Sequence, residues 1–365
     1  MRILVLLPGL LDSLGGIQTY HRCLIKALDE ISIVPGFEIY VYVLNDKPKG
    51  NYNSFVKSNR VKISGFGRNK SLFFIASVIS ALSSNSVILG HINFIYVALC
   101  MFGLGKQLTK YLMVYGVDVW KRLSFLQRIA VARVDTIIAI SNFTKNEMIK
   151  HNDLKQDKFF ILPCTLDPFY EEEDGVVPSV NLPNGKIILT VSRLSSEDKY
   201  KNIDKVIEAM PLILNELPDA YYVIVGDGSD RKRLEDLAHK LNLGDRVIFA
   251  GRVSEVALKE YYKRADVFVL VSLLEGFGIV FLEAMYYGVP CVGVRFGGIP
   301  EVIDDKKSGC IVSPNNHEEL VKAVSLLLVD KSLCKQYGQC GKDKLEQYFL
   351  FDKYKKNLGR LLLTN

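Results

Sequence analysis

The sequence predicts an α/β protein with two doubly wound domains in tandem, and three observations favour this class. Apolar, β-branched runs alternate with helical segments almost throughout the chain, which implies parallel sheets covered on both faces. The length of 365 residues exceeds the size at which one hydrophobic core usually stops growing. Residues 167–185 hold four consecutive acidic residues, three prolines and two glycines, a composition typical of a linker between domains.

The first domain is expected to span residues 1–168. Its expected strands are short apolar runs at Arg2–Leu7, Glu38–Leu44, Ser86–Gly90, Tyr111–Tyr115 and Thr136–Ile140. The expected helices cover Gly16–Glu30, Lys121–Val134 and Asn142–Asn152. The apolar N-terminus could be taken for a signal peptide, but it breaks at Pro8 and Gly9 and no clear small-residue cleavage site follows. A buried first strand is the better interpretation.

The alternation restarts in the second domain, which is expected over residues 169–346. Its expected strands are Lys186–Ser192, Tyr221–Gly226, Arg246–Ala250, Val267–Val271 and Pro290–Val294. Its expected helices cover Ile203–Glu216 and Asp230–Leu241, and others start near Gly278 and after Asn316. Residues 347–365 contain an amphipathic segment, which we expect to pack back across the first domain. Because open parallel sheets bind ligands outside the carboxyl ends of their strands, two such sheets facing each other would form a central cleft.

The charge and the cysteines limit the possible partners. The formal net charge is +6, and the Lys and Arg residues are dispersed, so a nucleic acid is not an expected partner. Mild basicity suits phosphorylated ligands or an anionic membrane surface, although a plain solvated surface explains it equally well. The seven cysteines never form a C-x-x-C pair, which favours a reducing cytoplasm and argues against a disulfide scaffold or a zinc site.

Two apolar segments, Leu72–Leu82 and Ile92–Leu104, are too short to cross a bilayer. Buried core helices are their simpler explanation. The alternative is peripheral contact with the inner face of the cell membrane, which would suit a lipid-linked ligand.

A glycine pair and a cation pair are the first candidates for ligand binding. Gly15 and Gly16 precede a helix whose free N–H groups can hold an anion, although a flexible turn explains them equally well. Arg193 follows the first strand of the second domain, and Lys201 follows a few residues later. A fixed guanidinium and a mobile ammonium together suit a diphosphate, while the alternative is ordinary surface charge.

The strongest pattern is Glu275-Gly276-Phe277-Gly278-Ile279-Val280-Phe281-Leu282-Glu283. Its glycines mark a strand-to-helix loop, so Glu275 lies on the loop, Glu283 lies inside the helix, and the helix N-terminus between them can bind phosphate. Two carboxylates suit the hydroxyls of a sugar and a ribose. Apolar neighbours make an unpaired Glu283 unfavourable, which argues against a merely solvated helix face. Two further strand-end loops leave room for a ligand near the backbone, Gly226-Asp227-Gly228 and Gly251-Arg252-Val253.

This succession of motifs resembles the family-4 retaining glycosyltransferases of the GT-B fold over nearly the whole chain, including Gly288-Val289-Pro290 and Gly297-Gly298 with Glu301. The resemblance implies two Rossmann-like domains facing a cleft and a UDP-, GDP- or ADP-sugar donor. The residues it places at the donor are Gly15, Gly16, Arg193, Lys201, Gly226, Asp227, Gly251, Val253, Glu275, Gly276, Phe277, Gly278, Ile279, Val280 and Glu283. It implies no metal or other cofactor, because the cations and the helix terminus supply the positive charge.

The resemblance also assigns roles to these residues. Arg193 and Lys201 would neutralise the leaving diphosphate, Glu275 would hold the sugar and Glu283 the ribose. The family often carries H-G-x-D at the end of a first-domain strand, where this chain has Tyr115-Gly116-Val117-Asp118. Asp118 therefore joins Arg193, Lys201 and Glu275 as an expected catalytic residue, whereas Tyr115 replaces the family histidine. His91, after an earlier strand, is either a second candidate or a structural histidine.

The mechanism we hypothesise is front-face transfer of a hexose-type sugar to a saccharide or lipid-linked saccharide acceptor. No residue stands out as a covalent nucleophile, so the leaving phosphate would accept the proton of the acceptor hydroxyl. A nucleotide-sugar epimerase of the same fold, or a non-catalytic nucleotide-sugar-binding protein, is the alternative. A phosphorylase would need a cofactor lysine context that the sequence lacks, and a nicotinamide dehydrogenase would need a G-x-G-x-x-G fingerprint.

Overall fold

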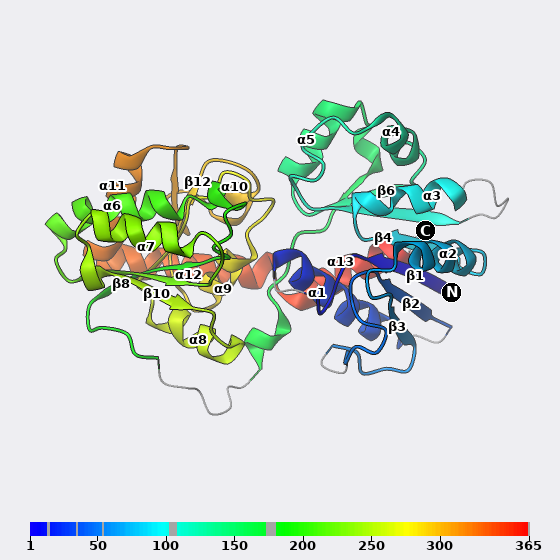
Figure 1. Cartoon of the computed structure of the whole chain (residues 1–365), viewed down its shortest axis with the longest axis horizontal. Helices are drawn as coiled ribbons and strands as arrows, with labels where there is room; N and C mark the ends of the chain where they lie inside the picture. The colour runs from blue at the N-terminus through cyan, green and yellow to red at the C-terminus, as the bar shows by residue number, and fades with distance from the viewer. Residues whose placement is uncertain (13–14, 34–35, 53–54, 102–107, 173–179, 364–365) are drawn as a thin grey trace. The chain divides into compact units, whose positions relative to one another are not determined.

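A computed structural model describes residues 1–12, 15–33, 36–52, 55–101, 108–172 and 180–363. The chain divides into two compact units, each with its own parallel sheet (Figure 1). Unit 1 is Met1–Asp167 together with Phe351–Asn365, and unit 2 is Pro168–Leu350. The α/β class and the two Rossmann-like sheets predicted from the sequence are confirmed.

The sheet of unit 1 has seven strands in the order β3-β2-β1-β4-β5-β6-β7, and its strand pairs are parallel. The strands are β1 (Arg2–Leu7), β2 (Glu38–Val43), β3 (Val61–Gly65), β4 (Ser86–Leu89), β5 (Thr109–Val114), β6 (Thr136–Ala139) and β7 (Phe159–Ile161). The central strands β1 and β4 are almost wholly buried, as continuous apolar runs in a parallel sheet should be. The edge strand β3 alternates between buried and exposed residues instead.

The helices of unit 1 cover both faces of this sheet. They are α1 (Gly16–Ile31), α2 (Lys70–Ala81), α3 (Ile95–Met101), α4 (Phe125–Val131), α5 (Asn142–Asn152) and α13 (Phe351–Leu363), with short 3-10 turns η1 (Ile92–Phe94) and η2 (Gln156–Lys158). Right-handed crossovers place α1 on one face and α2 to α5 on the other, since the strand order reverses after β3. Side chains of Asn69, Ser124 and Ser141 cap the starts of α2, α4 and α5.

The closing helix α13 packs against α1 in unit 1 (Figure 1). The rings of Tyr354 and Tyr20 meet edge to face at 5.6 Å, and Lys355 pairs with Glu30 at 2.5 Å. The expected start at residue 347 is corrected to Phe351, because the preceding helix continues to Tyr348 and the Phe349 N–H still donates to the Leu345 carbonyl.

The sheet of unit 2 has six parallel strands in the order β10-β9-β8-β11-β12-β13. The strands are β8 (Lys186–Val191), β9 (Ala220–Val225), β10 (Val247–Gly251), β11 (Val267–Leu270), β12 (Cys291–Val294) and β13 (Gly309–Val312). The helices are α6 (Ile203–Glu216), α7 (Arg231–Lys240), α8 (Glu255–Arg264), α9 (Ile279–Tyr286), α10 (Ile299–Val302), α11 (His317–Val329) and α12 (Lys331–Tyr348), with turns η3 (Pro168–Glu171), η4 (Lys199–Lys201) and η5 (Gly244–Arg246). On this sheet α11 packs against α6, and α12 packs against α9.

Two expectations about helices are corrected. The helix expected over Lys121–Val134 is the shorter α4, because the Leu123 N–H donates to the Asn152 side chain and the Ser124 cap starts the helix only at Phe125. The apolar segment Leu72–Leu82 is not simply a core helix, because α2 leaves several large apolar side chains exposed. The described part of the second segment, residues 92–101, is mostly buried. Among the described residues, no helix combines the length and apolar character needed to cross a membrane.

Candidate functional site

The candidate site of unit 2 lies in loops at the carboxyl ends of its strands. Lys201, in the turn η4 after β8, forms an ion pair with Glu275 after β11, with 2.7 Å between Nζ and Oε2. The two side chains are 21% and 18% exposed, so the pair is half-buried yet accessible. The Leu273 N–H donates to the Tyr200 carbonyl at 2.8 Å, which joins the two loops through their backbones. The sequence-predicted residues Lys201 and Glu275 are therefore brought together.

Arg193 belongs to the same group of side chains. Its Nε donates to Asp198 at 2.6 Å, while 62% of the side chain stays exposed. Burial opposes ionisation of Asp198, but hydrogen bonds from Arg193 and Tyr200 outweigh it and lower the pKa of that carboxyl. Arg193 and Lys201 line one small hollow, which a phosphate could approach, and its full lining is Arg193, Leu194, Ser195, Asp198, Lys199, Lys201, Ile203, Asp230, Arg233 and Leu234.

The helix that carries the second carboxylate begins without a side-chain cap. Gly278 is its N-cap residue, with φ +94 in the left-handed region, and it supplies no side-chain cap to the first turn of α9. The first-turn N–H groups of Ile279 and Val280 are therefore suited to an anion. Phe277, by contrast, is 2% exposed and packs on Phe349, so only its backbone can reach a ligand.

Glu283 is held by tyrosines from two other elements. The hydroxyl of Tyr262 in α8 donates to its Oε2 at 2.6 Å, and the hydroxyl of Tyr170 in η3 bonds to it as well. Burial and the neighbouring carboxylate both raise the pKa of Tyr262 well above its usual range. Glu283 is thus a fixed, hydrogen-bonded group rather than a solvated surface acid. Sequence patterns gave no signal for either tyrosine.

The glycine pair Gly297-Gly298 brings two loop backbones together. A Cβ on Gly297 would lie 2.2 Å from the Glu275 carbonyl oxygen, and one on Gly298 would lie 2.1 Å from that of Gly276. The Gly298 N–H donates to the Glu275 carbonyl at 2.9 Å. These glycines therefore fix the position of the loop that carries Glu275.

The loop after β9 follows the same principle. A Cβ on Gly226 would lie 1.9 Å from the Ser192 carbonyl, and one on Gly228 would lie 2.2 Å from that of Leu194. The Gly226 N–H donates to the Gly251 carbonyl at 2.8 Å, which joins this loop to the end of β10. The other expected residues are less constrained: Asp227 lies 3.9 Å from Arg231, and Val253 is half-buried after β10.

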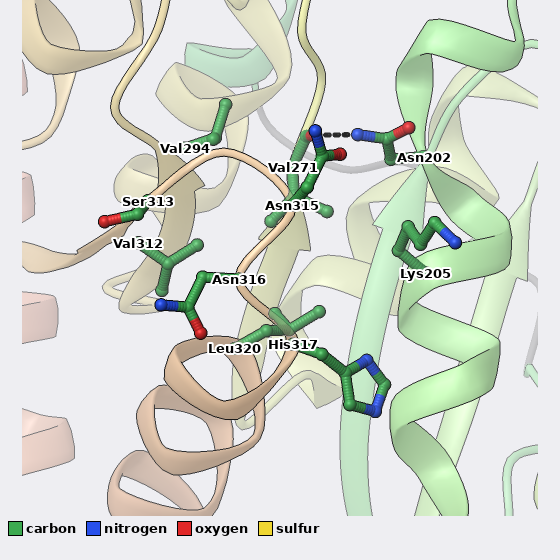
Figure 2. Close-up of a pocket in the computed structure, with 10 residues that line it drawn as sticks. All are labelled: Asn202, Lys205, Val271, Val294, Val312, Ser313, Asn315, Asn316, His317 and Leu320. Carbon is green, nitrogen blue, oxygen red and sulfur yellow. Dashed lines mark hydrogen bonds between the residues drawn. The ribbon is translucent and has the colours of Figure 1, made fainter.

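A second hollow in unit 2 lies at the carboxyl ends of β11, β12 and β13, where Val271, Val294 and Val312 meet (Figure 2). The Asn202 side chain donates to the Val271 carbonyl across its rim at 3.0 Å. The lining of this hollow does not include Arg193, Lys201, Glu275 or Glu283.

In unit 1, a buried network joins the loops at the carboxyl edge of the sheet. The Nε2 of His21 lies 2.7 Å from the Tyr115 hydroxyl oxygen, and its Nδ1 lies 3.2 Å from the Gly9 carbonyl oxygen. The Tyr115 hydroxyl donates to the Gly90 carbonyl at 3.0 Å. Burial lowers the pKa of His21 to about 4, so its ring is neutral near physiological pH. No motif in the sequence marks His21, because it is a single histidine within α1.

The other predicted residues of unit 1 lie around this network. Gly15 is the extended N-cap of α1, without a side-chain cap, and Gly16 is its first helical residue. Asp118 Oδ1 accepts the Gly116 N–H at 2.8 Å, while its Oδ2 is buried without a hydrogen-bond partner among the described residues. Burial raises the pKa of Asp118 to about 6. His91 caps η1 by accepting the Asn93 N–H, and burial lowers its pKa too.

The sequence matches to known proteins cover only part of the chain. Residues 177–344 match the family described as glycosyl transferases group 1. An uncharacterized glycosyltransferase of Methanocaldococcus jannaschii is 35% identical over 222 residues, which are 58% of this chain and 56% of that protein. A GDP-mannose-dependent alpha-(1-6)-phosphatidylinositol monomannoside mannosyltransferase of Mycobacterium tuberculosis is 32% identical over 180 residues, 47% of each chain. The matches thus span only about half the length of these curated relatives.

The solved structures cover more of the chain. Anabaena Alr3699/HepE in complex with UDP superposes over 100% of both chains with a TM-score of 0.79 and 18% sequence identity. This similarity shows that the two Rossmann-like units belong to the GT-B fold. Over residues 177–344 the chain is therefore similar to the glycosyl transferases of group 1.

Proposed function

We propose that the protein is a family-4 retaining glycosyltransferase, which moves a hexose-type sugar from a nucleoside diphosphate sugar to a saccharide or lipid-linked saccharide. The observation that carries this proposal is the 2.7 Å ion pair between Lys201 and Glu275, directly ahead of the uncapped start of α9. A cation, an anion and a helix N-terminus in one place match the sugar and the diphosphate of such a donor. The names of the group 1 relatives support the same activity.

The donor would use the groups of unit 2 in distinct ways. Lys201 can bind a phosphate and keep Glu275, because an ammonium has three N–H donors. Arg193, oriented by Asp198 and mostly exposed, would bind the same diphosphate. Glu275 would accept sugar hydroxyls, and Glu283, fixed by its tyrosines, would accept ribose hydroxyls. We propose that no metal is needed, because these cations and the first-turn N–H groups of α9 offset the negative charge of the diphosphate.

In the reaction proposed, the bond between the anomeric carbon and the diphosphate oxygen breaks, and the acceptor oxygen bonds to the same face of that carbon. The departing phosphate oxygen takes the proton of the acceptor hydroxyl. Arg193 and Lys201 would lower the barrier by binding the leaving group more tightly as its charge grows. A product with the donor's anomeric configuration is expected, and an inverted product would refute this mechanism.

We also propose that the reaction serves polysaccharide or glycoconjugate biosynthesis in the cytoplasm, with a peripheral position at the inner membrane face. The mycobacterial relative takes a lipid acceptor by its name, which favours a lipid-linked acceptor here. The base of the donor is open between UDP, GDP and ADP.

Thermal shift of the full chain tests the donor site. One of UDP, GDP and ADP should raise the melting temperature of the wild type. The Lys201→Ala substitution should lower the affinity for that nucleotide by about tenfold or more, because hydrogen bonds to charged groups contribute about 1.5–3 kcal/mol. Lys205→Ala is the matched control, because Lys205 lies nearby on α6 but pairs with Glu208. If no nucleotide stabilises the wild type, or both variants respond alike, the proposed site is wrong.

The alternative activity is nucleotide-sugar epimerisation on the same fold. An epimerase would convert the nucleotide sugar into its epimer without any acceptor, whereas a transferase releases nucleoside diphosphate when an acceptor is present. Measuring that release from the preferred donor, with and without saccharide acceptors, separates the two. Nucleotide binding without any turnover would indicate the non-catalytic binding protein instead.

A further inference from the structure

Helix α2 presents a stripe of large apolar side chains to solvent. Leu72, Ile75, Ile79 and Leu82 are 54%, 56%, 61% and 51% exposed. Their spacing of three, four and three residues places them on one face of a helix. The opposite face, with Phe73, Ser77 and Ser80, is buried against the unit. The α2 stripe, as we call these four residues, is therefore open to solvent along one face of the helix.

This face is unusual for a surface helix. Such helices carry charged or polar residues on their solvent side, yet the helical part of α2 beyond Lys70 contains no charged residue. The neighbouring helix α3 packs against α2 and adds the 39% exposed Tyr96 (Figure 1). Large apolar side chains gathered on an exposed helix face typically mark a contact with a protein or a membrane.

The charge around the stripe indicates which of these it contacts. From Lys47 to Val117 the chain contains nine Lys and Arg residues and no Asp or Glu. Exposed Arg68 and Lys70 stand at the start of α2, where positive charge opposes the helix dipole and so does not stabilise the helix itself. A second copy of this face would meet it with charge of the same sign, whereas an anionic lipid surface is complementary to it.

We propose that the α2 stripe inserts into the headgroup region of an anionic membrane, with Arg68 and Lys70 contacting lipid phosphates. An interfacial helix of this type lies in the membrane plane and buries its apolar face just below the headgroups. The inference deepens the proposed function, on whose peripheral membrane position it rests, by naming the surface that makes the contact. It holds for unit 1 alone and requires no particular nucleotide or acceptor.

Vesicle flotation of the full-length protein tests the proposal. The wild type should float with vesicles rich in phosphatidylglycerol at low salt and much less with pure phosphatidylcholine. Ile75→Gln with Ile79→Gln should lower binding by about tenfold or more, because apolar side chains lose their burial in lipid. Arg68→Gln with Lys70→Gln should weaken binding by about tenfold on anionic vesicles only, and added salt should remove that difference.

The matched control is Leu326→Gln with Val329→Gln on α11 of unit 2. These side chains are 47% and 63% exposed and stand three residues apart, yet α11 starts with two acidic residues. They should not alter flotation. Melting temperatures show whether each variant is folded, and nucleotide thermal shifts without vesicles show whether the donor site fails independently.

Several results would overturn the proposal. One is a wild type that stays unbound with anionic vesicles at low salt. Another is stripe variants that bind within about twofold of the wild type, or control variants that lose binding equally. A third is a wild-type dimer, seen by light scattering, that the stripe substitutions dissociate while vesicle binding is absent, because the stripe is then an interface between two copies.

Discussion

The buried His21 should make the stability of unit 1 depend on pH. Burial lowers its pKa to about 4, from 6.5 in an unfolded chain, so below about pH 6.5 the unfolded state binds a proton that the folded state does not. The stabilisation that is present above that pH is lost as the pH falls toward about 4. From about pH 7.5 to about pH 5, His21 should lower the free energy of unfolding by about 2 kcal/mol.

Asp118 acts in the opposite direction over the same range. Its pKa is about 6 when folded and 3.8 when unfolded, so the folded state takes up the proton first as the pH falls. This titration should raise the free energy of unfolding by about 1 kcal/mol between about pH 7.5 and about pH 5. In the wild type, the contributions of His21 and Asp118 to the pH dependence of the free energy of unfolding therefore partly cancel.

Substitution of His21 separates the two titrations. The His21→Gln variant keeps a donor and an acceptor but does not titrate, so its free energy of unfolding relative to that of the wild type should be about 2 kcal/mol higher at about pH 5 than at about pH 7.5. Urea unfolding followed by tryptophan fluorescence measures this in unit 1, because Trp120 is the only tryptophan of the chain.

His151→Gln on α5 is the matched control, since its exposed ring meets water before and after unfolding. The control should follow the wild type at each pH. If His21→Gln shows the same pH dependence as the wild type, the buried neutral imidazole is not the source of the effect and the reasoning fails.

Three further substitutions test other contacts. Asp118→Asn should raise the free energy of unfolding at about pH 7.5 by about 1–2 kcal/mol, because a part-buried carboxylate no longer has to ionise; unchanged urea midpoints would contradict this. Gly298→Ala should destabilise unit 2 by about 2 kcal/mol or more, because its Cβ meets the Gly276 carbonyl, whereas the Cβ of Gly288→Ala points into open space and should cost only about 1 kcal/mol. Circular dichroism melts that rank the two variants the other way would refute the loop contact. Tyr262→Phe should lower the free energy of unfolding of unit 2 by about 1.5–3 kcal/mol and weaken nucleotide binding, whereas the neighbouring Tyr261→Phe should leave both nearly unchanged. Equal effects of the two substitutions in thermal shift would exclude a special role of the hydrogen bond to Glu283.

The sequence predicted the strands and helices best where the pattern was long and apolar. Strands such as β1 and β8 and helices such as α5 and α6 were placed to within a residue. The short strands β3 and β13 were missed, because five or four residues with mixed character carry no clear period. The polar helix α8 was missed too, although Ser254 caps it and gave a usable signal.

The site was predictable as residue types but not as contacts. Glu275 and Lys201 were proposed for different parts of a ligand, whereas the structure joins them in one ion pair across 74 residues of sequence. The tyrosines of Glu283 come from η3 and α8, which only the folded chain brings together. The order of the strands in the sheet determines which distant side chains come into contact, and no local pattern in a single sequence encodes that order.

The tyrosine that replaces the family histidine shows why a motif departure needs the structure. Tyr115 is 7% exposed, and its hydroxyl is committed to His21 and the Gly90 carbonyl. An imidazole is therefore still present at this edge, but it comes from α1 and is buried. Among the described residues of this edge, His91 and the unpaired oxygen of Asp118 can still form polar contacts. The pKa of Asp118 is about 6, so this carboxyl changes protonation near neutrality. The departure thus lies within unit 1, whereas the ion pair of Lys201 with Glu275 is formed entirely by residues of unit 2.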